Sequence, residues 1–145
     1  MQPGDLLDIA RTLRNMDGPA AKRSAISRAY YFAYHSLRAW LVGENIRIRE
    51  SGGGHEDVTN ALWYSKHDHL RGMSRAAQSL RTSRLGADYR LARSEFEAHG
   101  NAVAAVEIAE VLMEDLDAFR LLAIDEQTAA IEAMRTAMDP NRSER

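Results

Sequence analysis

The segment from Pro19 to Val42 constrains the fold most strongly, because it contains no glycine or proline after its first residue. Its alanines, leucines, arginines and aromatic residues favour an α-helix roughly 35 Å long at about 1.5 Å per residue. Pro19 suits the first turn of such a helix and Gly43 suits its end. A helix of this length needs neighbours that cover its apolar face, so we expect a helical bundle.

The rest of the chain also follows the helical period. Apolar residues recur at spacings of three and four, which predicts further helices over residues 5–16, 56–65, 68–82, 94–122 and 125–138. Ser94 and Glu97 form a capping-box pattern at the start of the long helix. Residues 84–90 contain Gly86 and Asp88 and are therefore predicted to be a connector, and residues 44–54 are predicted to be a glycine-rich loop.

The fold class that follows is all-α. We expect an antiparallel up-and-down helical bundle of four to five main helices with short flanking helices. Residues 1–138 would form one domain, and residues 139–145 would form a frayed C-terminal tail.

Composition excludes several classes of protein. The chain has no cysteine, which rules out a disulfide framework and a thiolate zinc site. His67 and His69 would point apart on a helix and have no evident third ligand, so we expect no metal and no cofactor. Neither a signal-peptide pattern nor an apolar run of membrane-spanning length is visible, which predicts a cytoplasmic protein without a membrane anchor.

Charge is distributed unevenly along the chain. Residues 1–93 hold 15 Lys/Arg and 9 Asp/Glu, whereas residues 94–145 hold 4 Lys/Arg and 12 Asp/Glu. This asymmetry indicates either a surface that binds a polyanion or a basic helix that packs beside an acidic one. Four arginines on or just after the helix over 68–82 are candidates for binding an RNA backbone, and a solvated basic face is the alternative: Arg71, Arg75, Arg81 and Arg84.

The predicted helix over 19–42 has two faces on a helical wheel. The core face carries Ile26, Tyr30, Ala33, Leu37 and Leu41. The opposite face carries Arg28, Tyr31, Phe32 and His35. An aromatic face that points away from the core needs cover, so we expect Tyr31 and Phe32 to lie in the interface of a homodimer.

Two sequence motifs resemble a known superfamily. Residues 27–36 read Ser-Arg-Ala-Tyr-Tyr-Phe-Ala-Tyr-His-Ser, and residues 84–89 read Arg-Leu-Gly-Ala-Asp-Tyr, ahead of a long alanine-rich segment. Together they resemble a small-protein branch of the HEPN superfamily over about residues 5–120. The resemblance implies a dimeric bundle. It also implies a metal-independent endoribonuclease of a toxin–antitoxin or defence system. The alternative is a non-catalytic dimerisation module that binds an antitoxin, a nucleotidyltransferase, a nucleotide or RNA.

Catalytic members of the superfamily use an arginine followed, after four to six residues, by a histidine. Arg28 and His35 match this spacing, so the resemblance implies that Arg28 holds a phosphate, His35 moves a proton and Tyr31 supports them. Arg49 and His55 match it too, but they flank the glycine loop, so we expect them to lack a fixed geometry. An interface hydrogen-bonding role for Arg28 and His35 is the alternative.

Overall fold

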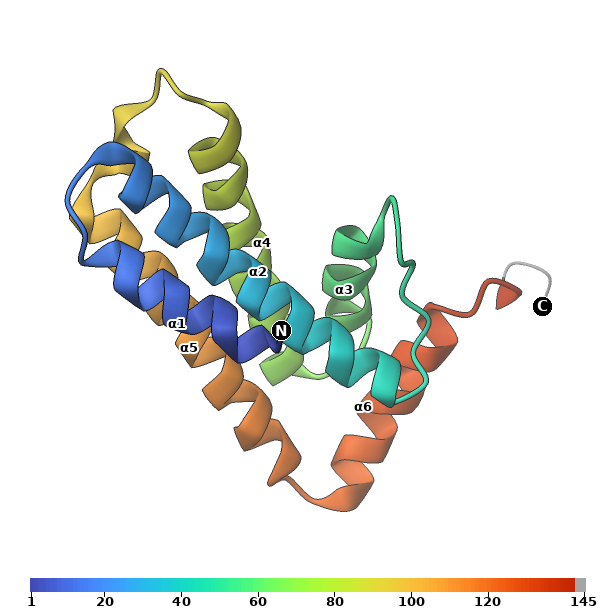
Figure 1. Cartoon of the computed structure of the whole chain (residues 1–145). Coiled ribbons are helices and arrows are strands. Elements are labelled where there is room, and N and C mark those ends of the chain that lie inside the picture. Colours follow the sequence, from blue (N-terminus) through green and yellow to red (C-terminus); the bar gives the residue numbers. More distant parts are fainter. Residues whose placement is uncertain (143–145) are drawn as a thin grey trace.

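A computed structural model describes residues 1–142 and is built from helices (Figure 1). The six α-helices are α1 (Pro3–Arg14), α2 (Pro19–Gly43), α3 (Gly54–Trp63), α4 (Asp68–Tyr89), α5 (His99–Arg120) and α6 (Ile124–Ala137). A short 3₁₀ helix, η1 (Ser94–Glu97), precedes α5. No strand occurs within residues 1–142, and the all-α prediction is confirmed.

Helix α2 forms the centre of the bundle. It packs against α1, α4 and α5, while α3 lies along α4 and α6 turns away from the end of α5 (Figure 1). Leu37 and Leu41 of α2 are fully buried together with Leu70 of α4 and Leu112 of α5. Burial of each such side chain stabilises the fold by about 1.5–3 kcal/mol. The four main helices and the flanking α3 and α6 therefore form the bundle that the sequence predicts.

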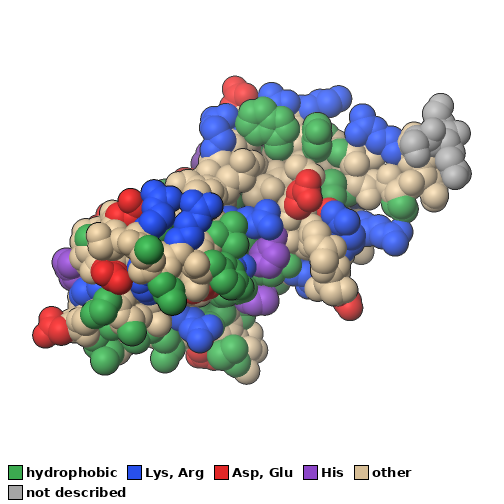
Figure 2. Space-filling model, turned by 90° about the horizontal axis from the view of Figure 1, so that it is seen from above, with side chains coloured by type: hydrophobic (Ala, Val, Ile, Leu, Met, Phe, Trp, Pro, Cys, Tyr) green, Lys and Arg blue, Asp and Glu red, His purple; other side chains and the backbone are tan. Residues whose placement is uncertain are grey.

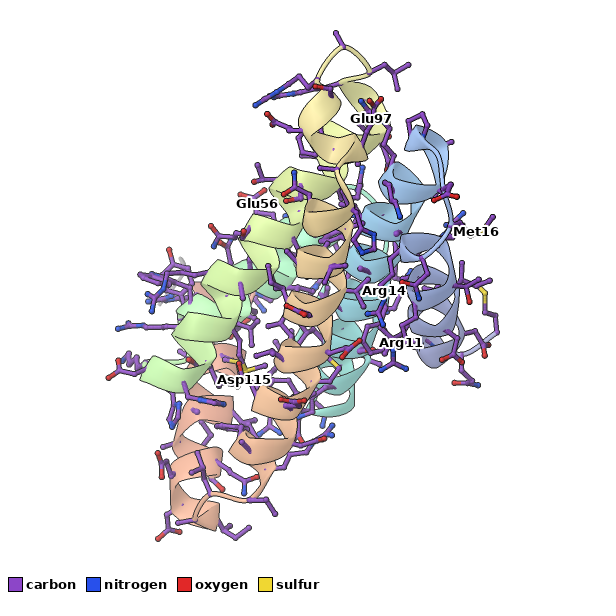
Figure 3. The ribbon with its side chains drawn as sticks, turned by 90° about the vertical axis from the view of Figure 1, so that its left-hand side faces the viewer. Arg11, Arg14, Met16, Glu56, Glu97 and Asp115 are labelled. Atoms are coloured by element: carbon purple, nitrogen blue, oxygen red, sulfur yellow. The ribbon has the colours of Figure 1, made fainter. Side chains whose placement is uncertain are left out.

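Part of the charge asymmetry is compensated inside the bundle. Arg11 and Arg14 project from α1 toward α5 (Figure 3), where both pair with Glu110, at 3.2 and 3.7 Å. At the other end, His67 contacts Glu126 of α6 at 2.7 Å between Nε2 and Oε1. These contacts join individual residues of the part of the chain that is rich in Lys and Arg to carboxylates of the part that is rich in Asp and Glu.

The predicted connector over residues 84–90 is wrong. Helix α4 continues to Tyr89, and Arg84 and Ala87 are buried within it. Gly86 does not break the helix; instead, a Cβ at this position would lie 2.0 Å from Cζ of Phe96. The glycine is needed because the Phe96 ring packs directly on the helix backbone.

The predicted start of the long helix is also wrong. Ser94 and Glu97 belong to the separate helix η1, and Ala98 is extended, with ψ at 134°. Helix α5 therefore begins at His99 and not at Ser94.

A buried arginine joins α2 to the segment between α4 and α5. The Arg23 side chain is 7 % exposed and donates a hydrogen bond to the Glu97 carboxylate at 3.2 Å. It also donates, at 2.8–3.3 Å, to the carbonyl groups of Gly86, Ala87, Arg90, Leu91 and Arg93. Carbonyl groups at the C-terminal end of a helix have no N–H partners within the helix. The Arg23 guanidinium supplies the missing donors and thereby fixes how α4 ends.

The remaining features of the fold concern the apolar character of the helices and the C-terminal residues. Within residues 1–142, none of the helices combines the length and the apolar character required to cross a membrane. Residues 139–142 of the predicted tail follow α6 and include a turn at 140–141, whereas residues 143–145 lie outside the described part of the chain.

Candidate functional site

Aromatic and imidazole rings gather where the start of α3 meets α2. Tyr30, Tyr31, Tyr34 and His35 come from successive turns of α2, and His55 comes from the first turn of α3. The His55 ring stacks on Tyr34 with 4.1 Å between centroids, and the His35 ring lies 5.1 Å from the same tyrosine. We call these five residues the tyrosine–histidine cluster. Two imidazoles thus lie against one tyrosine ring.

The loop before α3 is held in place, contrary to the expectation for Arg49 and His55. The Arg49 guanidinium donates two hydrogen bonds to the Asp57 carboxylate, at 2.8 and 2.9 Å, and the Arg49 backbone N–H donates a third at 2.9 Å. A Cβ at Gly54 would lie 2.6 Å from the Tyr34 hydroxyl. Because the loop closes tightly on α2, His55 has a defined position.

The environment of the cluster shifts the pKa values of two of its side chains, Tyr30 and His55. Burial raises the pKa of the Tyr30 phenol to about 12, and the hydroxyl contacts Nδ1 of His55. Burial also lowers the pKa of His55, and the positive charges of Arg81 and Arg84 lower it further. His55 is therefore neutral near neutral pH, and its Nε2 has no hydrogen-bond partner within residues 1–142.

Two arginines border the cluster, and one of them is paired with a carboxylate. Arg84 is 7 % exposed, and its guanidinium carbon lies 5.1 Å from the Tyr31 ring centroid and 5.5 Å from that of Tyr30. Its nearest carboxylate, Asp88, is 3.8 Å away. The Nε atoms of Arg81 and Arg84 are buried and have no hydrogen-bond partner in residues 1–142. Asp88 offsets part of the charge of Arg84, and the neighbouring Arg81 forms no ion pair within residues 1–142, so the edge of the cluster favours an anionic ligand.

The four predicted RNA-binding arginines separate into two groups. Arg81 and Arg84 border the tyrosine–histidine cluster, as their effect on the pKa of His55 indicates. Arg71 and Arg75 lie at the other end of α4, where both guanidinium groups contact the ring of Trp63.

The predicted catalytic and interface residues of α2 differ in exposure. Arg28 and His35 are both exposed, and Tyr31 is half-buried with its ring 6.1 Å from that of His35. Arg28 has no side-chain hydrogen bond or ion pair within residues 1–142. Phe32 is 7 % exposed and belongs to the core, so its predicted place on the outward face is wrong. Three helices surround α2, which leaves only a narrow exposed strip.

The exposed edge of the cluster is accessible. In the view from above, histidine side chains reach the surface between α3 and the end of α4, beside lysine or arginine side chains (Figure 2). A pocket of about 320 Å³ opens next to His35 between α1 and α2, and Leu6 and Arg38 also line it. This volume is at the low end of the range for small-molecule sites. The surface around His35 therefore has room for part of a ligand.

The other histidines make structural contacts. His67 contacts Glu126, and Nε2 of His69 contacts the Asp115 carbonyl at 2.7 Å. Across the described residues 1–142, no group of three or more histidine, aspartate or glutamate side chains gathers as a metal site.

Comparison with protein-family models, with curated proteins and with solved structures found no match. Sequence reasoning did not assign Tyr30, Tyr34 or His55 to the candidate site, because Tyr30 fits the core face and His55 follows three glycines. The Arg49–His55 spacing was the available signal for His55.

The Arg49–Asp57 ion pair predicts a pH-dependent contribution to stability. The hydrogen bond from Arg49 holds the pKa of Asp57 below its ordinary value, so the contribution is present above the unfolded-state pKa and is lost as pH falls through the folded-state pKa. Because the Arg49 guanidinium is exposed and solvent screens the pair, we expect Asp57→Asn to lower the free energy of unfolding at pH 7 by no more than about 1 kcal/mol.

Urea unfolding at pH 7 and pH 3 measures this contribution. The difference between wild type and Asp57→Asn should narrow at pH 3. Glu56→Gln is the control, since the exposed neighbouring carboxylate accepts no hydrogen bond from Arg49. An equal difference at both pH values would contradict the assignment.

Proposed function

We propose that this chain is a HEPN-type endoribonuclease that cleaves RNA by acid–base chemistry at the tyrosine–histidine cluster. The observation that carries the proposal is the pair of imidazoles, His35 and His55, against one tyrosine ring, with two arginines acting on His55. RNA supplies a phosphate for the arginines at this edge, and its 2′-hydroxyl and 5′-oxygen are groups between which imidazoles transfer protons. The proposal extends the expected Arg28, His35 and Tyr31 site to His55, Arg81 and Arg84.

The proposed reaction is an internal transesterification. His55, which is neutral, accepts the 2′-OH proton at Nε2 in the tautomer whose Nδ1–H donates to Tyr30. The 2′-oxygen attacks phosphorus, the bond to the 5′-oxygen breaks, and His35 gives that oxygen a proton. The products are a 2′,3′-cyclic phosphate and a 5′-hydroxyl.

The arginines stabilise the charge that develops in this reaction. Arg84 and Arg81 offset negative charge on the phosphorane, because a guanidinium donates to phosphate oxygens in a fixed geometry. Arg28, two helical turns from His35 on the exposed strip of α2, holds a neighbouring phosphate. Tyr31 keeps the His35 ring oriented by stacking.

A homodimer in the cytoplasm is part of the proposal. The exposed strip of α2 carries Arg28, half-buried Tyr31 and His35, and a second copy against it would bring two sites together. The second candidate function is a non-catalytic module in which this strip contacts an antitoxin or nucleotidyltransferase. It is favoured by the absence of any side-chain partner for Arg28 within residues 1–142.

Cleavage of RNA in EDTA tests the proposal. The purified protein should cut single-stranded RNA without added metal and leave 2′,3′-cyclic phosphate ends, and the same RNA with 2′-O-methyl groups should remain intact. His35→Ala should retain the helical circular dichroism spectrum and lose cleavage. A folded dimer that cuts none of several RNAs would overturn the nuclease proposal and support the second function.

A further inference from the structure

An exposed tryptophan lies under two arginines at the end of α3 remote from His55. Trp63 is 39 % exposed, and the guanidinium carbons of Arg71 and Arg75 are 5.2 and 5.7 Å from its ring centroid. Nε of Arg71 also donates to the Trp63 carbonyl at 2.9 Å. We call this stack of one indole ring and two guanidinium groups, from Trp63, Arg71 and Arg75, the tryptophan–arginine layer.

The charge of this layer is not compensated by the protein. Neither Arg71 nor Arg75 pairs with a carboxylate within residues 1–142. The exposed apolar surface of Trp63 is in contact with water, which is unfavourable, and the two adjacent guanidinium cations repel each other. A ligand that offers both a flat π-face and a negative charge would satisfy the layer, and a nucleotide in a strand has both.

The layer and the tyrosine–histidine cluster lie at opposite ends of one helix pair. Helix α3 carries His55 at its start and Trp63 at its end, a separation of about 12 Å at about 1.5 Å per residue. Ser74 Oγ of α4 donates to the Thr59 carbonyl of α3 at 2.8 Å, which holds the two helices together between these points. A short oligonucleotide along this pair would contact both places.

We propose that the tryptophan–arginine layer is a stacking subsite for an unpaired base of single-stranded RNA whose scissile phosphate lies at the tyrosine–histidine cluster. This inference rests on the proposed function and adds a subsite for a base near the scissile phosphate. Bases in a duplex are stacked on their neighbours and do not offer a free face, so the layer selects single strands.

The fluorescence of Trp63 measures binding at the proposed subsite. The chain has two tryptophans, and Trp40 is buried against Phe119, so Trp40→Phe leaves Trp63 as the only tryptophan, which is excited selectively at wavelengths where tyrosine does not absorb. An uncleavable 2′-O-methyl oligouridine about ten nucleotides long is a suitable probe. We expect it to quench Trp63 emission in a saturable way, and we expect a blunt duplex of the same length to leave the emission unchanged.

Anisotropy of the same oligomer with a 5′ label measures affinity in the otherwise unmodified chain. Trp63→Ala should weaken Kd on the order of tenfold, because stacking on one aromatic ring is worth that much. Tyr64→Ala is the matched control, since Tyr64 is the next residue, is 50 % exposed and has no guanidinium over its ring among residues 1–142; its Kd should not change.

Three outcomes overturn the subsite. They are unchanged Trp63 emission at saturating oligomer, equal quenching by the duplex, and equal Kd values for the Trp63→Ala and Tyr64→Ala variants. Cleavage assays separate this failure from that of the proposed function. If His35→Ala loses cleavage but Trp63 emission does not change on binding, only the subsite proposal is rejected. If the oligomer quenches Trp63 emission but the wild-type chain does not cleave RNA, only the nuclease proposal is rejected.

Discussion

Replacing Arg23 with alanine is expected to lower the free energy of unfolding by about 3–5 kcal/mol, because it removes one partner from a buried charged network. The Arg23 side chain serves five carbonyl groups and the Glu97 carboxylate, and no other side chain in residues 1–142 takes its place. Thermal unfolding followed by circular dichroism should show Tm lowered by about 10 °C or more.

Two variants separate the hydrogen-bonding role of Arg23 from its charge. Arg23→Lys keeps the charge but offers three donors at one point, so it should recover only a small part of the lost stability. Arg28→Ala, in the same helix, removes an exposed arginine without a side-chain partner in the described residues and should change stability by less than about 0.5 kcal/mol. Equal Tm values for Arg23→Ala and Arg28→Ala would contradict this role.

Loss of either imidazole of the tyrosine–histidine cluster is expected to reduce RNA cleavage about 10²–10⁴-fold in kcat/KM. Under the proposed function, His35 and His55 transfer different protons in one step, so the double variant should be little worse than the slower single variant. His69→Ala is the control, because His69 contacts the Asp115 carbonyl of α5 and not the cluster. Single-turnover cleavage of a labelled RNA compares the wild type with these four variants.

The pH profile tests which histidine is the base. Burial and two arginines lower the pKa of His55, so the acidic limb of kcat/KM should fall below the ordinary imidazole value of about 6.5. Arg81→Gln removes one of these charges and should move that limb to higher pH. An unmoved acidic limb in Arg81→Gln would show that His55 is not the base.

The local helix signals predicted most of the fold. Pro19 and Gly43 lie at the ends of α2 as the sequence indicated, because proline and glycine act on the backbone of their own residue. Gly86 was misinterpreted because its role depends on the Phe96 ring from another element. The local pattern contains no information about which side chain approaches a glycine from elsewhere in the chain.

The candidate site was predictable only in part, for a similar reason. His35 and Tyr31 share one strip of a single helix, so the wheel could place them together. Phe32 was misplaced because the wheel does not show how many helices surround α2. The Arg49–Asp57 ion pair fixes the loop that places His55 against Tyr34. Residue spacing alone does not reveal this ion pair.

Under the proposed function, an RNA phosphate binds between His35 and His55, and histidine NMR tests this binding without relying on cleavage. The chain has five histidines, so their ring signals can be assigned by substitution. On saturation with 2′-O-methyl oligouridine, the His35 and His55 signals should shift, and those of His67 and His69 should stay in place. Unchanged His35 and His55 signals, with the oligomer bound according to anisotropy, would contradict the account.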